Sequence, residues 1–166
     1  MVQLTLILDN LRSSHNVGAL LRTADSLGVF QVYACGITPY PQALQDARDP
    51  VVAGRNTRAI AKTALGAESS VSVEHFDDTP AAIAAARAAG CAIFGLEQTP
   101  QSVDIATLRG KDLTGPIALV VGNEVSGGGT DVLAACDVVI TIPQRGRKES
   151  LNVAVAAGIA LYQLLA

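Results

Sequence analysis

Residues 142–165 read IPQRGRKESLNVAVAAGIALYQLL, and the rest of the fold can be worked out from this stretch. The β-branched run at residues 138–142 predicts a buried strand. Residues 144–150 are polar and basic around one glycine, and residues 151–165 are apolar almost all round, which is typical of a core helix. A strand, a basic glycine loop and a helix in succession form the general layout of an anion or nucleotide site. The alternative is an ordinary strand-to-helix turn with solvated charges.

Two glycine patterns that mark phosphate binding are absent from the sequence. No GxGxxG follows a predicted strand, and no GxxxxGKS/T occurs in the 166 residues. A nucleotide-dependent oxidoreductase would need the first pattern, so the sequence argues against that class of enzyme. A ligand at the loop 144–150 has to be held in another way.

The composition is that of one globular domain. The chain has 166 residues, of which 49% are hydrophobic and 16% are charged. Its net charge of −3 argues against a protein that coats nucleic acid by non-specific binding, but it permits a local basic patch. Seven of the 12 basic residues fall in two short segments, unless they are simply scattered solvated charges; they are Arg48, Arg55, Arg58, Lys62, Arg145, Arg147 and Lys148.

The cysteines and the chain ends indicate a cytoplasmic protein. Cys35, Cys91 and Cys136 are odd in number and lack metal-ligand spacing, so we expect reduced core thiols. With two histidines in the chain, we expect no metal site. The N-terminal segment lacks the basic start of a signal peptide. The last apolar segment carries Asn152 and Gln163 and is too short to span a membrane.

Strand-like and helix-like segments alternate along the chain. We expect strands at residues 4–8, 30–35, 71–76, 91–96, 117–121 and 138–142. We expect helices at residues 16–27, 57–65, 80–89, 130–135 and 151–165, with Asn16 capping the first and Gly28 ending it. This alternation predicts a single α/β domain with a mainly parallel six-stranded sheet flanked by helices.

Four polar or glycine-rich loops follow predicted strands. In sheets of this kind, ligands bind outside the carboxyl ends of the strands. We therefore expect the site where the loops at residues 9–16, 97–99, 122–129 and 144–150 converge. This convergence locates a site without naming a reaction.

Three motifs resemble one known family. They are NVGALLRTADSLGV at residues 16–29, LVVGNEVSGG at residues 119–128 and IPQRGRKESLNVAVA at residues 142–156. Their order and spacing resemble the SpoU/TrmH family of RNA ribose 2'-O-methyltransferases in the SPOUT superfamily, over nearly the whole chain. The resemblance implies a deep C-terminal trefoil knot and S-adenosylmethionine bound in the knot loops. It also implies a homodimer whose active site crosses the subunit interface.

The resemblance implies five catalytic residues. Arg22 matches the arginine of the first motif; because a guanidinium group is not deprotonated in proteins, we expect Arg22 to anchor a phosphate and polarise the 2'-hydroxyl rather than act as a base. Asn16 is expected to orient the substrate or Arg22, and Glu124 to pair with Arg22 or hold a loop amide. Ser150 and Asn152 match the pair in the third motif. The alternatives are a solvated Arg22, an Asn16 that only caps its helix, an exposed Glu124, and a Ser150 that caps the final helix.

The resemblance also implies a pocket in which backbone N–H and C=O groups make most of the polar contacts to the cofactor. Its residues are Leu96, Gly122, Ile142 and Leu151, although the three apolar ones could equally be ordinary core. This sequence departs from the family pattern at Gln144 and Arg145 and in the glycine run 127–129, which puts the detailed shape of the pocket in doubt.

We expect no separate RNA-binding domain before Met1 or after Ala166, so the catalytic domain itself would hold tRNA or rRNA. The residues expected to contact phosphates, drawn from two subunits, are Arg12, Arg48, Arg55, Arg58, Arg145, Arg147 and Lys148. The rival hypothesis is a protein of the same fold that binds RNA or S-adenosylmethionine without catalysis.

Overall fold

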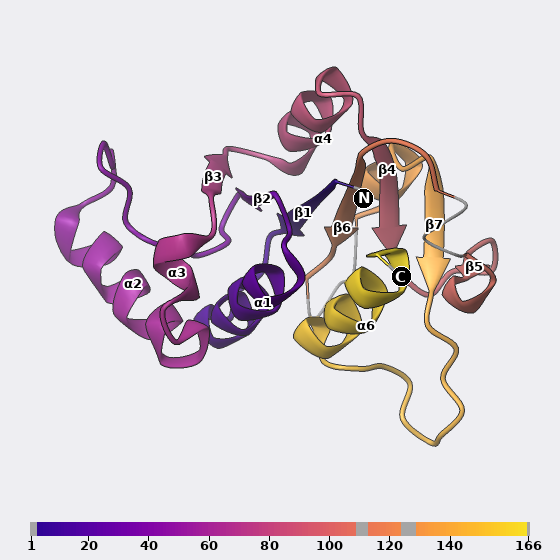
Figure 1. Cartoon of the computed structure of the whole chain (residues 1–166). Helices are drawn as coiled ribbons and strands as arrows, with labels where there is room; N and C mark the ends of the chain where they lie inside the picture. Colours follow the sequence, from indigo (N-terminus) through magenta and orange to yellow (C-terminus); the bar gives the residue numbers. More distant parts are fainter. Residues whose placement is uncertain (1–2, 109–112, 124–128, 166) are drawn as a thin grey trace.

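The computed structural model shows one parallel sheet with helices on both faces (Figure 1). It describes residues 3–108, 113–123 and 129–165. Within these ranges the strands are β1 (Leu4–Asp9), β2 (Gln31–Cys35), β3 (Val73–Phe76), β4 (Ala92–Leu96), β5 (Val103–Asp104), β6 (Ile117–Val121) and β7 (Val138–Thr141). Their order is β3-β2-β1-β6-β4-β7-β5, and all neighbours are parallel. The predicted parallel α/β class is confirmed. The predicted count of six strands is wrong because β5, at two residues, is too short to show periodicity.

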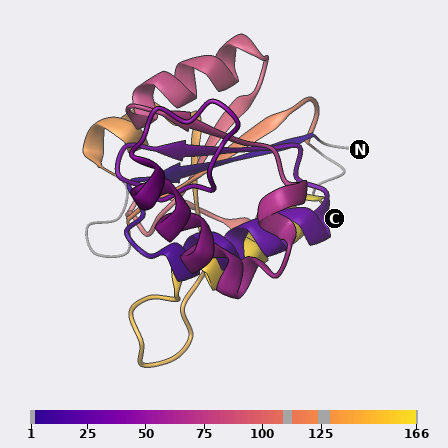
Figure 2. The same cartoon turned by 90° about the vertical axis from the view of Figure 1, so that its left-hand side faces the viewer.

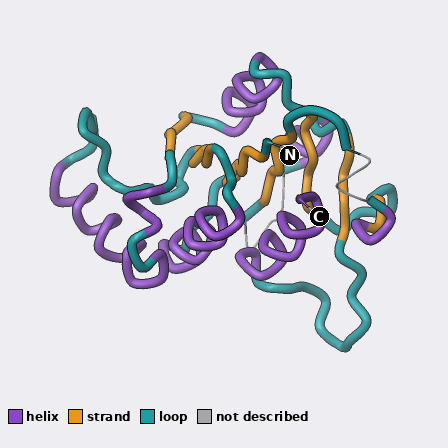
Figure 3. The backbone as a smooth tube through the Cα atoms, in the orientation of Figure 1, coloured by secondary structure: helices purple, strands orange, loops and turns teal. Residues whose placement is uncertain are grey.

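The helices form two layers (Figures 1 and 3). They are α1 (Ser14–Leu27), α2 (Pro50–Ala64), α3 (Ala67–Ser70), α4 (Thr79–Ala88), α5 (Thr130–Ala134) and α6 (Val153–Leu165), with a 3-10 turn η1 (Ile105–Thr107). One face of the sheet is covered by α1, α2, α3 and α6, and the other by α4 and α5. None of the described helices is long and apolar enough to cross a membrane.

The alternation of side chains along the central strands builds two cores. In β1, Leu4, Leu6 and Leu8 pack on the side of α1 and α6. Ile7 packs on the opposite side with residues of α4. Successive side chains of a strand point to opposite faces, so a strand covered on both faces is expected to be largely apolar. This explains why β6 is a continuous apolar run and why β1 is apolar except at Thr5 and Asp9; both strands are buried along their whole length.

The predicted cap Asn16 is wrong, and so is the alternative in which Ser150 caps the final helix. In α1 the side chain of Ser13 accepts a hydrogen bond from the backbone N–H of Asn16 (3.2 Å), so Ser13 is the cap and Asn16 lies inside the first turn. In α6 the Oδ1 atom of Asn152 accepts from the N–H of Ala154 (2.9 Å), so Asn152 and not Ser150 caps this helix. The predicted end of α1 at Gly28 is confirmed by its left-handed backbone (φ 68°).

The second helix begins well before the predicted start at residue 57. Asp49 accepts hydrogen bonds from the N–H groups of Val51 and Val52, and Pro50 occupies the first helical turn. Proline fits this position because the first N–H groups of a helix have no intrahelical partner. The connection between the predicted strand at residues 30–35 and this helix is therefore shorter than predicted, and α3 was not predicted.

Candidate functional site

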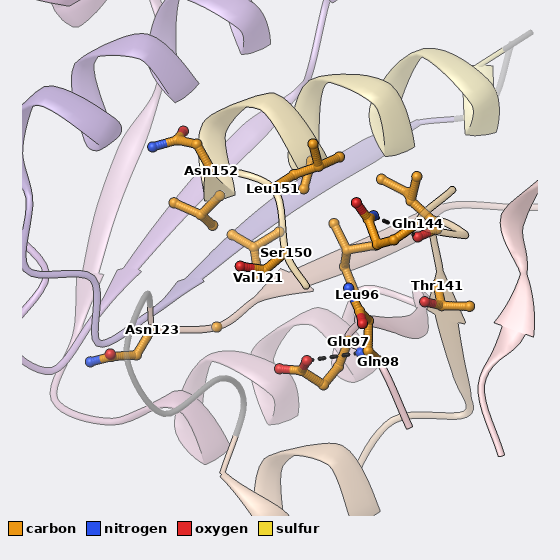
Figure 4. A pocket seen from close by; sticks show the side chains of 14 residues that line it. Leu96, Glu97, Gln98, Val121, Asn123, Thr141, Gln144, Ser150, Leu151 and Asn152 are labelled. Atoms are coloured by element: carbon orange, nitrogen blue, oxygen red, sulfur yellow. Dashed lines mark hydrogen bonds between the residues drawn. The ribbon is translucent and has the colours of Figure 1, made fainter. Parts of the chain in front are cut away.

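A cavity of about 500 Å³ opens at the carboxyl ends of β4, β6 and β7 (Figure 4). This volume lies within the ~300–1,000 Å³ of typical small-molecule sites. The cavity is lined from three strand ends and from the start of α6 by Leu96, Glu97, Gln98, Val121, Gly122, Asn123, Thr141, Ile142, Gln144, Ser150, Leu151, Asn152, Val153 and Ala156. Three of the four loops expected to converge thus meet here.

All four residues implied as cofactor-binding line this cavity. Leu96 comes from the end of β4, Gly122 follows β6, Ile142 follows β7, and Leu151 precedes α6. Segments far apart in the sequence therefore supply one surface. Glu97 and Gln98 were predicted as part of the loop 97–99, although not as individual site residues. Thr141 and the small Ala156 were not predicted.

Hydrogen bonds fix the loops around the cavity. The N–H of Glu97 donates to the carbonyl of Ile140 (3.0 Å), which holds the end of β4 against β7. The side-chain amide of Gln98 donates to the carbonyl of Glu149 (2.9 Å). This bond ties the basic segment 143–152 to the opposite rim of the cavity.

The loop after β1, the fourth of the expected loops, joins the site through Asn10. This residue has a left-handed backbone (φ 53°), which asparagine tolerates better than most residues. Its side chain donates to Asp9 (3.0 Å) and accepts from the N–H of Ile37 (3.3 Å). Its carbonyl accepts from Nδ2 of Asn123 (3.0 Å), whose side chain points away from the other labelled residues in Figure 4. Asn10 therefore connects the ends of β1, β2 and β6.

A buried carboxylate lies under this connection. Asp9 is 4% exposed, and its Oδ1 atom accepts hydrogen bonds from Thr79 at the start of α4 and from Asn10. A buried carboxylate is tolerated when donors satisfy it. Asp9 and Asn10 were predicted only as part of the loop 9–16, although a polar pair directly after a buried strand was a usable signal.

The predicted catalytic residues fall into two groups in a single subunit. Nδ2 of Asn152 donates to Oδ1 of Asn16 (3.1 Å), so the first and third motifs meet, and Ser150 lines the cavity. Arg22 is exposed on α1 and lines a separate groove instead. Glu124 lies outside the described residues. One subunit therefore does not bring Arg22 to the cavity.

The groove that holds Arg22 runs between helices. It is lined by Arg22 from α1, Lys62 from α2 and Tyr162 from α6, among others. A neighbouring groove between α1 and α6 is lined by Asn16 and Ile159 and shares Tyr162. Lys62 was noted in the sequence only as part of a basic cluster.

The chemistry of the cavity fits a cofactor with a cationic centre and an apolar ring system. Glu97 is the one ionisable side chain among the described lining residues. A carboxylate attracts a sulfonium or an ammonium group and repels a phosphate. Leu96, Ile142 and Leu151 offer apolar surface for a planar base. The residues present therefore fit S-adenosylmethionine.

The residues predicted to bind RNA have different surroundings. Arg48 forms an ion pair with Asp46, covers the ring of Tyr40 (3.4 Å to its centre) and donates to the carbonyls of Tyr40 and Pro41. The Arg48 guanidinium holds the pKa of Asp46 far below its usual range. Arg48 thus stabilises the loop before α2, and its donors are engaged within the chain. The other six side chains are exposed: Arg12, Arg55, Arg58, Arg145, Arg147 and Lys148.

The three cysteines form no disulfide among the described residues. Cys35, Cys91 and Cys136 are free thiols. Burial raises the pKa of Cys35 to about 12 and that of Cys136 to about 11. Within the described ranges, no group of three or more His, Cys, Asp and Glu side chains could hold a metal ion.

The sheet and cavity define a parallel α/β domain with a ligand-sized cavity at the carboxyl ends of its strands, where such domains bind their ligands. The profile of the SpoU rRNA Methylase family matches residues 3–162, and the chain belongs to this family.

Known relatives extend the comparison. The chain is 31% identical over 160 residues to the tRNA (guanosine(18)-2'-O)-methyltransferase of Escherichia coli, covering 96% of this chain and 62% of that protein. It is 32% identical over 160 residues to the 23S rRNA (guanosine-2'-O-)-methyltransferase of Ralstonia nicotianae. This match covers 96% of this chain and 57% of that protein. The chain thus spans about three-fifths of the length of these relatives.

A solved structure matches the fold. The AdoMet-bound rRNA methyltransferase from Sinorhizobium meliloti superposes with a TM-score of 0.77 at 28% identity, covering 98% of this chain and 55% of that one. AdoMet is S-adenosylmethionine. The similarity extends over the complete described sheet and both helix layers, because almost the whole chain is covered.

Proposed function

We propose that this protein transfers a methyl group from S-adenosylmethionine to a ribose 2'-hydroxyl of tRNA or rRNA. The observation that carries the proposal is the cavity, where Leu96, Gly122, Ile142 and Leu151 meet from separate loops. The names of the relatives support the reaction and both classes of RNA. The AdoMet-bound neighbour supports the cofactor.

The cavity residues suggest how the cofactor would be held. Leu96, Ile142 and Leu151 would pack against its adenine, and backbone groups of the loops after β4, β6 and β7 would read the edge of the base. The carboxylate of Glu97 would favour the cationic end. When bound, S-adenosylmethionine supplies a methyl group on a positively charged sulfur, which an oxygen nucleophile can take directly.

The protein's task in this reaction is positioning and charge management. The 2'-oxygen has to release its proton to water and line up with the methyl carbon, so that the oxygen–carbon bond forms as the carbon–sulfur bond breaks and the neutral thioether leaves. A guanidinium group is a poor base, so the proposed role of Arg22 is to anchor the adjacent phosphate and polarise the hydroxyl. The Asn16–Asn152 hydrogen bond sets the start of α1, and therefore Arg22, relative to α6. Glu124 stays a predicted partner of Arg22 or of a loop amide.

A homodimer would bring Arg22 to a cavity. The outer face of α6 exposes Val155 (52%), Ile159 (42%) and Tyr162 (67%), an apolar stripe beside α1. A twofold dimer places the same face of both subunits in contact. We propose that this face is the dimer interface and that Arg22 of each subunit acts at the cavity of the other.

The dimer has a direct test. Ile159→Asp would bury two unpaired carboxylates at the twofold interface and should give a monomer in sedimentation velocity at micromolar concentration. Val51→Asp, on α2 at a position that is 74% exposed, is the matched control and should leave a dimer. A wild-type monomer at this concentration would contradict the shared site.

We also propose the C-terminal trefoil knot of this family. In support, the segment 143–152 is tied to the loop after β4 by the Gln98–Glu149 hydrogen bond before it enters α6 beside β6. Pulling the 166-residue chain from its two ends in optical tweezers tests this. A knotted chain stops short of the full ~3.3–3.6 Å per residue, whereas an unknotted chain reaches it.

RNA would be held by exposed cations on the catalytic domain. We retain Arg12, Arg55, Arg58, Arg145, Arg147 and Lys148 in this role and leave out Arg48, whose donors bind within the chain. A cytoplasmic location follows from an RNA substrate and agrees with three free thiols.

Transfer of labelled methyl groups to unmodified tRNA and rRNA transcripts tests the function. Ala156→Phe would fill part of the cavity, so we expect it to lose both S-adenosylmethionine binding in calorimetry and transfer. Arg22→Ala should keep cofactor binding and lose transfer by roughly 100-fold or more. Wild-type protein that binds both ligands but transfers nothing would favour the rival, a binding protein without catalysis.

A further inference from the structure

The exposed face of α2 carries a line of cations. Arg55, Arg58 and Lys62 are spaced by three and four residues, so they lie on one side of the helix and are all exposed. At 1.5 Å per residue they span about 10 Å along the axis. Figure 2 shows α2 at the front, at the outer edge of its helix layer. The line therefore faces solvent.

These charges are unbalanced within their own helix. The sequence of α2, PVVAGRNTRAIAKTA, contains no acidic residue, although the whole chain has a net charge of −3. In the described part of the structure, none of the three cations forms an ion pair. Lys62 lies in the last turn, where a cation complements the helix dipole. That effect fades within one turn, so it does not account for Arg55 and Arg58.

The line of cations on α2 ends beside Arg22, a predicted catalytic residue. Lys62 and Arg22 come from different helices but line the same groove. A polyanion that follows α2 from Arg55 to Lys62 would therefore arrive at Arg22. Arg22 is the residue expected to contact the phosphate beside the target ribose.

We propose that the α2 face, defined as Arg55, Arg58 and Lys62, is the docking surface that leads the RNA backbone to Arg22. Lys62 is then the phosphate-binding residue next to the reacting nucleotide. This inference rests on the proposed function and adds to it the path of the RNA. Its physical basis is the release of counterions when cations neutralise phosphates.

Salt-dependent RNA binding tests the path. The variant Arg55→Gln/Arg58→Gln/Lys62→Gln lowers the net charge by three. The matched control Ala81→Glu/Ala84→Glu/Ala88→Glu has the same charge change and the same spacing, on exposed positions of α4 across the sheet. The probe is an unmodified tRNA transcript, and its affinity is measured from low to physiological salt by fluorescence anisotropy.

The expected result is specific to α2. Three phosphate contacts correspond to a slope of log K against log salt that is smaller by roughly 2–3 units in the α2 variant. The control should keep the wild-type slope, and both variants should bind S-adenosylmethionine as the wild type does. The single variant Lys62→Gln should raise KM for RNA without lowering kcat, because a phosphate anchor binds substrate and transition state alike.

Two results would overturn the proposal while leaving the proposed function intact. One is an unchanged slope in the α2 variant. The other is an equal loss in the α4 control, which would mean that only the overall charge matters. A wild-type protein that binds neither tRNA nor rRNA would overturn the proposed function and this path together.

Discussion

Replacing Asn10 by alanine should destabilise the fold more than replacing it by glycine. Both changes remove the side chain that donates to Asp9 and accepts from Ile37, which costs about 1–3 kcal/mol. Alanine also has to adopt φ 53°, at a further cost of ~1–2 kcal/mol. Glycine avoids this strain but adds roughly 0.5–1 kcal/mol of unfolded-state entropy. The expected loss is therefore about 2–5 kcal/mol for Asn10→Ala, with Asn10→Gly about 1 kcal/mol more stable.

Urea unfolding of the two variants measures these differences. For a domain of this size each kcal/mol corresponds to ~2–4 °C in Tm, so a thermal scan gives an independent check. Because Asn123 bonds to the backbone carbonyl of Asn10, the glycine variant should also keep more affinity for S-adenosylmethionine. A glycine variant less stable than the alanine variant, or two variants as stable as the wild type, would refute the role given to the left-handed turn.

Three further predictions concern the core and the ion pairs. Cys35 is buried with its pKa raised to about 12, so it should resist a thiol reagent at pH 8 until urea unfolds the chain; rapid labelling of the native protein would contradict its placement. Leu119→Ala should lower the free energy of unfolding by about 2–5 kcal/mol, measured in urea, because this central β6 side chain is fully buried. The pKa of Asp137 is lowered by the N–H of Ile93 and by Arg87, so its stabilising effect is present above the unfolded pKa near ~3.9 and is lost as pH falls through the folded pKa. Asp137→Asn should therefore be destabilising at pH 7 and approach wild-type stability in acid, whereas a pH-independent difference would contradict the assignment.

The sequence was informative where burial forces a pattern. The largely apolar sequences of β1 and β6 follow from the cover on both faces of the sheet, and both strands were predicted closely. The start of α2 was missed because its signal is the Asp49–Pro50 cap rather than an apolar period. The two-residue β5 pairs only with β7 among the described strands and leaves no periodicity to read.

The site was predictable in part. Loop positions alone indicated the carboxyl edge of the sheet, and family resemblance selected four residues that the structure brings to one cavity. The connection through Asn10 depends on a left-handed backbone and on contacts distant in sequence, which local patterns do not reveal. The place of Arg22 outside the cavity is a property of the single subunit. Its proposed role therefore depends on assembly, which sequence patterns do not encode directly.

The position of the transferred methyl group tests the central claim most directly. RNA labelled by the wild-type protein from S-adenosylmethionine is hydrolysed in alkali, which cleaves next to a free 2'-hydroxyl and spares a 2'-O-methylated one. Methylation at the ribose predicts label in alkali-resistant dinucleotides, and no such label with Arg22→Ala. Label in mononucleotides would place the methyl group on a base and contradict the account.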